Sequence, residues 1–459
     1  MEHHTNVLHT EEQENLDLRE LAVESWNAPV IITTLVQFLN TLFEGKTTAI
    51  RRFQALCNSV IVIDEVQTVP PKMLSLFNTA VDFLAEICGA TVLLCSATQP
   101  FSDETPHPLR RCRGDVIPYD KALWEPFRRT VIENAGSKTL EEIGTFALDT
   151  LEKVQSLLVI CNKKDEAEYL FRMLAPHAEH SCHLSASMCM AHRRDVLCQL
   201  ESALKNKAKC LCVSTQVMEA GVDISFDCVI RLSAGMDSVI QAAGRCNRHG
   251  KELKPVPVYV VPCLGEKLGM LREIRDAKQA TDSLLEAFRQ NPEQFDGDLS
   301  SYKAIRRYYQ KLYASMPVNY PDFFIKAKAV SLFELLSCNY KYFDGNAAYA
   351  LRFIFTQAFR TAGSLFQVFE KDTRELVVPY GDGATHIAEL TANPKPEPQF
   401  LAHWVKKARP YTVTVYDWQL QSLGNAVTEH AGVAILSASF YDMETGLNLK
   451  PVKNDFLEV

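Results

Sequence analysis

The stretch NSVIVIDEVQ, residues 58–67, places two carboxylates directly after a run of four apolar residues. The run Val60–Ile63 predicts a buried strand that delivers Asp64 and Glu65 to its carboxyl end. Ligands of open parallel sheets bind at that edge. An aspartate there can hold Mg²⁺, and the next carboxylate can polarise a water for attack on a γ-phosphate. The alternative is that the two acids only mark the end of a strand.

Strands of the same kind alternate with helical stretches from about residue 28 to 265. This alternation predicts an α/β fold of parallel sheets covered by helices. The other expected strands are PVIITT (29–34), TVLLCSA (91–97), SLLVICN (156–162), CLCVST (210–215), CVIRL (228–232) and VPVYVV (256–261). Ser96 and Thr98 close the second of these, where two hydroxyls can couple a nucleotide site to a domain interface. Taken alone, Ser-Ala-Thr is a common turn.

Two segments further along the chain complete the pattern. VSTQVMEAGVDISFD, residues 213–227, ends a strand in polar residues and carries Asp223 in the following loop. QAAGRCNRHGK, residues 241–251, has the spacing i, i+4, i+7, one face of a helix, for Gln241, Arg245 and Arg248. Arginines presented from one lobe can meet phosphates held by another. A solvated basic face is the alternative, but the order of the motifs favours a two-lobed nucleic-acid motor.

Composition and charge narrow the class of protein. The chain has 459 residues, of which 47% are hydrophobic and 23% are charged, as in ordinary globular proteins. No apolar run reaches the ~18 to 20 residues of a membrane helix, so we expect no membrane segment. The net charge of -8 disfavours indiscriminate nucleic-acid binding, although a local basic groove is compatible with it. Most of the fourteen cysteines lie in apolar runs, which predicts reduced thiols in a cytoplasmic protein.

The motif series resembles a known family. It consists of TTLVQFL (33–39), DEVQ (64–67), SATQP (96–100), VICNKKDEA (159–167), LSASMCMAHRR (184–194), VSTQVMEAGVD (213–223) and QAAGRCNRHG (241–250). Together these are similar to the superfamily 2 motor of the CRISPR-associated helicase–nuclease of type I systems, and DEVQ and SMCMAHRR resemble the type I-C branch. That family joins a metal-dependent HD nuclease to two RecA-like lobes, a linker helix and a C-terminal cap.

The resemblance implies a domain order and a set of partners. The expected parts are a polar lead-in (1–27), a partial first RecA-like lobe (28–130), a second RecA-like lobe (131–265), a helical linker (266–345) and a small mixed α+β C-terminal cap (346–459). ATP and Mg²⁺ are the expected cofactors. Single-stranded DNA and a CRISPR guide-RNA surveillance complex are the expected partners.

The resemblance also implies site residues. Asp64 binds Mg²⁺ together with the nucleotide, and Glu65 orients the attacking water. Ser96, Thr98 and Asp223 take part in nucleotide binding and coupling, and the γ-phosphate is faced by Gln241, Arg245 and Arg248. The nucleic-acid strand is lined by Thr33, Thr34, Gln37, Asn162 and Thr215. Short hydroxyl and amide groups suit reversible, sequence-blind contacts, but Thr34 alternatively only caps a helix.

The tripeptide Gly-Lys-Thr in EGKTTAI, residues 44–50, imitates a phosphate-binding loop. That loop needs G-x-x-x-x-G-K-[ST] after a buried strand, and Asn40 stands where the first glycine is required. The residues before Gly45 continue an apolar helical pattern, so Gly45 is predicted to end a helix. No other stretch supplies the loop. We therefore expect the family's loop and its HD nuclease to lie upstream of Met1, leaving an unpaired apolar sheet edge.

A group of possible metal ligands lies in SCHLSASMCMAHRR, residues 181–194, and comprises Cys182, His183, Cys189 and His192. Structural zinc sites show paired short spacings such as C-x₂-C. These residues lack that spacing and coincide with a family motif that binds no metal. The sequence therefore favours a structural role over a zinc site.

Three functional hypotheses follow. The first is an ATP-dependent translocase that unwinds target DNA with 3′-to-5′ polarity in type I CRISPR interference. The second is a non-catalytic remnant, or half of a split enzyme that needs a separate chain carrying the HD nuclease and the phosphate loop. The third is another superfamily 2 DNA or RNA helicase. Whether the chain is an enzyme by itself is left open, because charge-assisted phosphate contacts of about 1.5–3 kcal/mol each are lost without the loop.

Overall fold

The computed structural model describes residues 2–3, 24–98, 105–110, 115–117, 120–219, 221–269, 271–318, 320–337, 356–368 and 373–451. Most of the expected lead-in 1–27, and the beginning of the expected cap (346–355), lie outside these residues. The chain forms two compact units, and each combines two stretches of sequence. Unit 1 comprises Met1–Pro118 and Ile305–Lys371, and unit 2 comprises Tyr119–Ala304 and Asp372–Val459.

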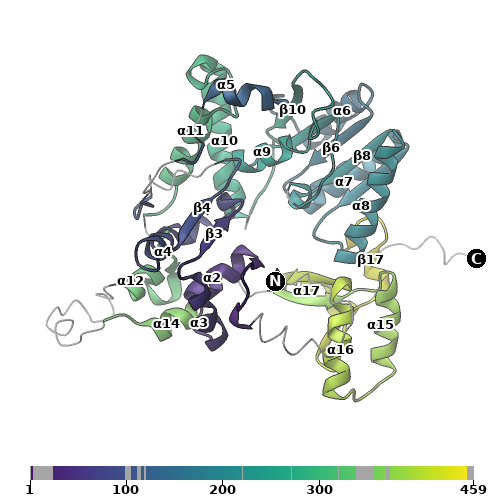
Figure 1. Cartoon of the computed structure of the whole chain (residues 1–459). Coiled ribbons are helices and arrows are strands. Elements are labelled where there is room, and N and C mark those ends of the chain that lie inside the picture. The colour runs from purple at the N-terminus through teal and green to yellow at the C-terminus, as the bar shows by residue number, and fades with distance from the viewer. Residues whose placement is uncertain are drawn as a thin grey trace, which may run out of the picture. The chain divides into compact units, whose positions relative to one another are not determined.

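Unit 1 is built on a short parallel sheet of β3 (Val60–Ile63) and β4 (Thr91–Leu94). Helix α4 (Leu74–Glu86) lies beside these strands (Figure 1) and shares a hydrophobic core with Ile63. The same core takes in helices from distant sequence: α2 (Leu35–Phe43), α12 (Leu332–Leu336) and α14 (Phe359–Leu365). A second parallel pair joins β1 (Glu2–His3) to β2 (Ile32–Thr33), and α3 (Thr47–Phe53) follows α2.

The other face of the β3–β4 sheet exposes apolar side chains. Val60 is 75% exposed, Val62 60% and Leu93 37%, whereas Ile63 on the opposite face is 6% exposed. The register pairs Val62 with Leu93, so these two lie next to each other on one face. Parallel sheets are normally covered on both faces. Among the described residues, no strand other than β4 pairs with β3.

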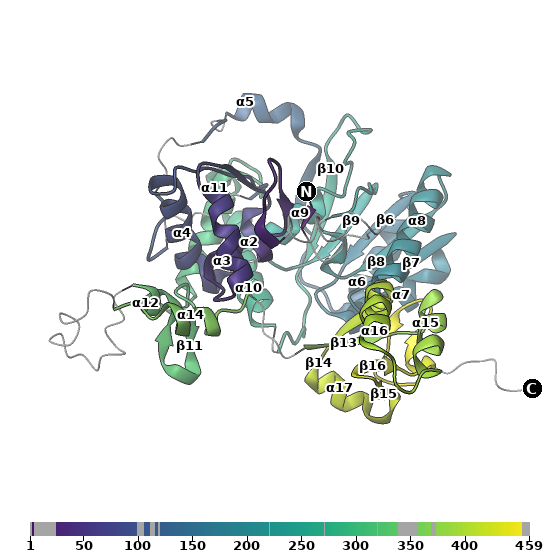
Figure 2. The same cartoon turned by 60° about the horizontal axis from the view of Figure 1, so that its bottom comes forward.

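Unit 2 contains a six-stranded sheet in which every pairing is parallel, which confirms the predicted parallel α/β fold. Every residue of the three strands β6, β8 and β9 is buried, and Figure 2 shows these strands side by side. The strand order is β5 (Thr130–Asn134), β10 (Val256–Val261), β9 (Cys228–Leu232), β6 (Ser156–Ile160), β8 (Cys210–Ser214) and β7 (His180–Leu184). The sequence pattern predicted four of these strands but neither β5 nor β7.

Helices cover the six-stranded sheet. A capping box at Thr139 and Glu142 begins α6 (Leu140–Leu151), and α7 (Lys164–Leu174) packs beside it in the same core. The remaining helices around the sheet are α8 (Met190–Lys205), α9 (Met236–Ala243) and α10 (Arg272–Gln290), the last of which was predicted as helical. None of the helices among the described parts of the chain combines the length and the apolar character that crossing a membrane requires.

The end of the chain adds a mixed α+β layer to unit 2. Its sheet has the order β14 (Thr412–Tyr416), β13 (Thr373–Val377), β16 (Val433–Leu436) and β15 (Val427–His430). Helices α15 (Asp382–Thr391), α16 (Pro398–Ala408) and α17 (Asp417–Leu423) accompany it. A small hairpin, β17 (Tyr441–Asp442) and β18 (Gly446–Leu447), contacts the loop before α8, since the Leu447 N–H donates to the Ser187 carbonyl at 2.8 Å.

Candidate nucleotide and nucleic-acid site

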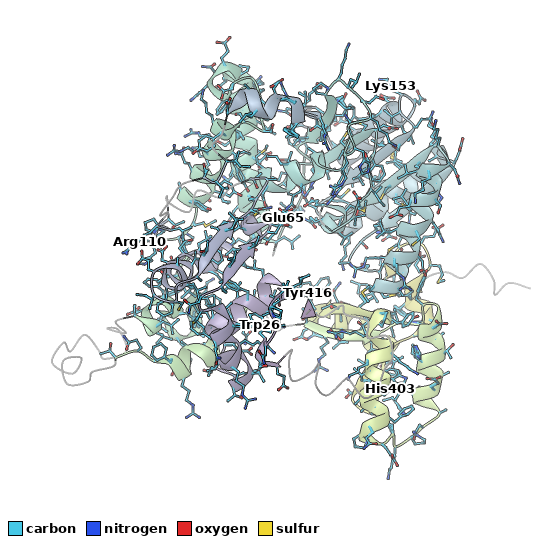
Figure 3. The ribbon with its side chains drawn as sticks, viewed as in Figure 1. Trp26, Glu65, Arg110, Lys153, His403 and Tyr416 are labelled. Carbon is cyan, nitrogen blue, oxygen red and sulfur yellow. The ribbon has the colours of Figure 1, made fainter. Side chains whose placement is uncertain are left out.

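The predicted carboxylate pair lies at the carboxyl end of β3, where Figure 3 labels Glu65. Asp64 is exposed, and its Oδ1 accepts a hydrogen bond from the Glu65 N–H at 2.9 Å. Glu65 itself is in the left-handed region, with φ 51° and ψ 47°. Such a backbone is unfavourable for a side chain larger than glycine and clusters at functional sites. The exposed Asp64 carboxylate suits a Mg²⁺ ligand.

A side-chain relay joins this pair to the Ser-Ala-Thr turn. The Gln67 amide donates to the Glu65 carboxylate, and its Oε1 accepts from the Ser96 hydroxyl at 2.5 Å. Ser96 Oγ in turn accepts from the Thr98 N–H at 2.9 Å, and the Thr98 carbonyl accepts from the Tyr309 hydroxyl at 3.2 Å. Tyr309 lies on α11 (Tyr302–Ala314). The two predicted motifs are therefore physically connected within unit 1.

Gln67 is a residue that the sequence-based prediction left out of the site. A glutamine amide has a donor and an acceptor on one rigid group, so it can bridge a carboxylate and a hydroxyl. Its place two residues after Glu65 in DEVQ was the available signal. Nothing in that spacing showed that Ser96 would be the second partner, because this contact spans 29 positions of sequence.

Arg245 is buried and holds a loop of its own unit. Its guanidinium donates to the carbonyls of Met218 at 2.9 Å, Glu219 at 2.7 Å and Val222 at 2.6 Å. We call the described residues 216–219 and 221–223 the motif loop; it contains the short helical turn Gln216–Met218. Three charge-assisted bonds to backbone oxygens fix the path of this loop. In this arrangement Arg245 shapes the loop, and contact with a γ-phosphate stays a prediction.

The prediction that Gln241, Arg245 and Arg248 share one helical face is wrong. Helix α9 ends at Ala243, so the two arginines follow the helix. The chain leaves the helix because it pairs with a neighbouring segment: the Phe226 N–H donates to the Arg245 carbonyl at 2.9 Å. A left-handed Asn247 (φ 46°) then reverses its direction. Only Gln241, which is half-buried, lies on α9 itself.

Two other predicted residues do come together. Arg248 Nε lies 2.6 Å from Asp223 Oδ1, with 38% and 74% of the two side chains exposed. An exposed ion pair of this kind contributes about 0–1 kcal/mol. Exchange of the carboxylate for a phosphate oxygen is therefore inexpensive, and the guanidinium is suited to bidentate phosphate contacts. Asp223 and Arg248 thus form a pair at the end of the motif loop that an anion can open.

The three predicted strand contacts in unit 1 follow one another along the chain. Thr34 Oγ1 accepts from the Gln37 N–H at 3.3 Å, so Thr34 caps α2, as the structural alternative predicted. Gln37 Oε1 accepts from Arg52 Nη1 at 3.2 Å. Thr33 belongs to β2 and is half-buried. A role of these side chains in binding a nucleic-acid strand stays a prediction.

The two predicted strand contacts in unit 2 are buried. Asn162 is 4% exposed, and its amide donates to the Ser233 carbonyl at 2.9 Å and to Glu266 Oε1 at 2.8 Å. Its Oδ1 accepts from Arg231 Nη1 at 2.7 Å. Thr215 is also 4% exposed. In this arrangement the Asn162 amide is fully used inside the lobe, so contact with a strand requires a rearrangement of these bonds.

The segment EGKTTAI does not follow a strand. Helix α2 ends at Phe43 directly before it, which confirms the predicted helix and its end. Lys46 pairs with Glu44 at 2.6 Å instead of standing in a glycine-rich cradle. Gly45 packs against Gly363, where a Cβ on Gly363 would lie 2.7 Å from the Gly45 nitrogen. Gly363 therefore permits the close contact of the two backbones, whereas a Cβ on Gly45 would meet Gly363 at no less than 3.5 Å.

The possible zinc ligands have separate partners. His183 is buried, and burial lowers its pKa to about 4. His192 Nδ1 lies 3.0 Å from the Tyr441 hydroxyl, which also accepts from the Cys189 N–H at 3.1 Å. Within the described ranges, no three His, Cys, Asp or Glu side chains are grouped so that they could hold a metal ion. Cys189 and His192 thus both contact Tyr441 of the β17–β18 hairpin and help to hold it in place.

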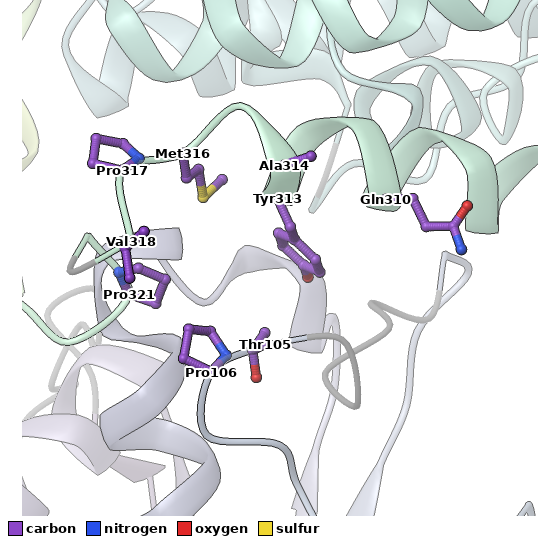
Figure 4. A pocket seen from close by; sticks show the side chains of 9 residues that line it. All are labelled: Thr105, Pro106, Gln310, Tyr313, Ala314, Met316, Pro317, Val318 and Pro321. Atoms are coloured by element: carbon purple, nitrogen blue, oxygen red, sulfur yellow. The ribbon is translucent and has the colours of Figure 1, made fainter.

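Unit 1 also contains an open cavity of about 510 Å³ between the end of α11 and the segment 105–106 (Figure 4). Its wall is mostly apolar and includes Tyr313, Met316 and Pro317. Among the described residues that line it, none is charged. The cavity therefore does not have the chemistry of a phosphate site.

Comparison with known proteins gives a consistent result. Residues 153–251 match the family model of the CRISPR-associated nuclease/helicase Cas3, C-terminal. A segment of 36 residues, 8% of this chain and 4% of the relative, is 61% identical to the CRISPR-associated nuclease/helicase Cas3 of Haloferax volcanii. The fold resembles the crystal structure of T. fusca Cas3 with ADP (TM-score 0.61, 15% identity, 92% of this chain and 57% of that chain).

A second solved structure agrees with the first. A chain of a CRISPR RNA-guided surveillance complex, pre-nicking, aligns with a TM-score of 0.56 and 15% identity over 95% of this chain and 62% of that chain. The chain thus spans little more than half the length of these solved relatives. The α/β fold is that of Cas3 helicases with two RecA-like lobes. The chain is therefore similar to Cas3 proteins both in the sequence of residues 153–251 and in its fold.

Proposed function

We propose that this chain is the motor portion of a type I CRISPR interference enzyme that couples ATP hydrolysis to movement along single-stranded DNA. The observation that carries the proposal is the relay from Glu65 through Gln67 to Ser96. It joins the residue expected at the attacking water to the turn expected to move on hydrolysis. T. fusca Cas3 has been solved with ADP, ATP and AMPPNP, which supports a nucleotide site in this fold.

The proposal assigns a role to five of the predicted site residues. Asp64 holds Mg²⁺ with the nucleotide, and Glu65 orients water toward the γ-phosphate. Ser96 responds to a change in the position of the Glu65 carboxylate, because Gln67 is hydrogen-bonded to both side chains. Arg248 exchanges Asp223 for phosphate oxygens. The bound Mg²⁺ supplies charge neutralisation at the phosphates.

We further propose that residues 1–459 by themselves hydrolyse ATP poorly and that a further polypeptide segment, in the same chain or in a separate one, completes the motor. This segment supplies the G-x-x-x-x-G-K-[ST] loop and an HD nuclease. The exposed face of Val60, Val62 and Leu93 supports the proposal, because a parallel strand and its helix would cover it. If the chain is instead a non-catalytic remnant, nothing covers this apolar surface. The completed motor acts in the cytoplasm together with a DNA-bound guide-RNA surveillance complex. The likeness to a chain of a CRISPR RNA-guided surveillance complex supports this choice of partner.

The test begins with binding and ends with turnover. The purified chain is titrated with a labelled oligothymidine and with the matching RNA, and its ATPase rate is measured with and without DNA. We expect preference for DNA and negligible hydrolysis until a polypeptide bearing the phosphate loop is added. DNA-stimulated hydrolysis should then appear, and Glu65→Gln should abolish it. Hydrolysis that is unaffected by Glu65→Gln would refute the motor assignment, and a preference for RNA would favour another superfamily 2 helicase.

A further inference from the structure

Arg231 is a charged residue in the interior of unit 2. It lies on β9, all five residues of which are buried, and its side chain is 0% exposed. An isolated buried guanidinium is strongly unfavourable, so such a group is tolerated only with partners for its donors. None of the predicted catalytic roles uses this residue. Its partners therefore indicate what it does.

Three side-chain partners of Arg231 come from three different segments of unit 2. Arg231 Nη1 donates to Asn162 Oδ1 at 2.7 Å, and Nη2 donates to Ser238 Oγ at 2.9 Å. Its Nε lies 2.9 Å from Glu219 Oε1, and Glu219 is 6% exposed. Asn162 belongs to the segment expected to line the nucleic-acid strand, Glu219 to the motif loop, and Ser238 to α9, which carries Gln241. One planar group thus joins the strand side of the lobe to its nucleotide side.

The motif loop is consequently held from two directions. Arg245 donates hydrogen bonds to three of its backbone carbonyls, while Arg231 forms a buried ion pair with the Glu219 carboxylate. Asp223 at the end of this loop carries the ion pair with Arg248. Because the guanidinium donors diverge in fixed directions, Arg231 cannot follow a displaced Asn162 and keep its geometry to Glu219. A change at one partner is therefore felt at the other.

We propose that Arg231 is a positioning residue that couples the hydrogen bonding of Asn162 to the placement of the motif loop. When a nucleic-acid strand draws the Asn162 amide away, the fork turns, and Glu219 shifts with it. The Asp223–Arg248 pair then changes its availability to phosphate. This inference rests on the proposed function, because it takes Asn162 to contact the strand.

The experiment measures hydrogen exchange of the motif-loop amides in the full chain with and without a saturating oligothymidine. Coupling energies of this kind correspond to changes of about 5- to 150-fold. We expect oligothymidine to change exchange in the unaltered loop by about tenfold. Arg231→Lys keeps the charge but loses the fork, so it should reduce this response to less than about twofold while oligothymidine affinity stays within about threefold.

Two further variants complete the test. Ser238→Ala removes one arm of the fork from a half-buried position, so it serves if Arg231→Lys does not fold, and it should also weaken the response. Arg172→Lys alters an exposed pair with Glu168 on α7 and should leave the response unchanged. A full response in both Arg231→Lys and Ser238→Ala would overturn the coupling role. Absence of oligothymidine binding by the unaltered chain would instead overturn the proposed function, and this inference with it.

Discussion

The attachment of the β17–β18 hairpin to the loop before α8 depends on Gly446. This residue has φ +85°, and a Cβ there would lie 2.4 Å from the Ser187 oxygen and 2.7 Å from the Ser187 carbonyl carbon. Both are backbone atoms, so no side-chain rotation can relieve the contact. The Leu447 N–H donates to the same Ser187 carbonyl at 2.8 Å. Gly446→Ala should therefore push the hairpin away from the loop before α8.

The magnitude can be separated into strain and contact. A left-handed backbone costs a non-glycine residue roughly 1–2 kcal/mol. Overpacking adds about 1–3 kcal/mol, and the lost hydrogen bond adds about 1 kcal/mol. Gly432 provides the matched control, because it has φ +79° in the same layer of unit 2 but a Cβ there meets nothing within 4 Å. Gly432→Ala should cost only the strain, so the two alanine variants should differ by about 2–4 kcal/mol.

Hydrogen exchange of the hairpin amides is the direct assay, because the hairpin can detach without unfolding the whole unit. A difference of about 2–4 kcal/mol corresponds to exchange roughly 30- to several-hundred-fold faster in Gly446→Ala than in Gly432→Ala. Urea unfolding followed by circular dichroism provides a second measurement. Equal exchange in the two variants would show that the contact with Ser187 contributes nothing beyond backbone strain, and the reasoning would be refuted.

Three other predictions use the same chain. Burial, reinforced by the Glu266 carboxylate, raises the pKa of Glu166 from 4.5 to about 7, so the folded state holds this proton more tightly. The protonated carboxyl contributes at most about 3 kcal/mol to stability; this contribution is complete below about pH 4.5 and is lost as the pH rises toward 7. Glu166→Gln should therefore flatten this part of the pH dependence of the urea unfolding midpoint. Gln67→Ala should slow ATP hydrolysis by the completed enzyme at least about tenfold, with a melting temperature within about 2 °C, because it breaks the Glu65 relay but no core contact; an unchanged rate would contradict the relay. Tyr441→Phe should lower the free energy of unfolding by about 1–3 kcal/mol, measured in urea, because two buried partners lose a hydroxyl.

The positions of most strands along the chain could be predicted from apolar runs that end in polar residues. Strand β3 with Asp64 and Glu65 follows that pattern, and so does β8 with Thr215. Strand β7 was missed because His180–Leu184 contains two histidines, a serine and a cysteine, and its identity as a strand comes from pairing with β8. Strand β5 was missed because Thr130–Asn134 lies across the boundary that was predicted between the first lobe (28–130) and the second lobe (131–265). Both require tertiary contacts that no local pattern contains.

The site was predictable by residue type more than by geometry. Asp223 and Arg248 were both predicted as site residues from motif order, but their pairing with each other was not predicted and comes from the structure. The course of the chain around Arg245 did not follow from its spacing, because pairing with Phe226 ends the helix earlier than the i, i+4, i+7 pattern implied. Gln67 and Arg231 were missed for one reason: each gains its meaning from a partner 29 or more positions away or from a distant loop.

The location of the buried polar groups separates two explanations for them. A buried ion pair is weak evidence for stability, because apolar residues of similar volume often stabilise a core equally well. The neighbouring strands β6 and β8 in the sheet of unit 2 consist mainly of buried apolar side chains. The Arg231 network reaches Asn162, directly beyond β6, where the carboxyl end of a parallel strand meets ligands. If the network served only packing, there would be no reason for it to lie at the carboxyl end of the strands. Its presence there favours positioning of the motif loop as its physical role.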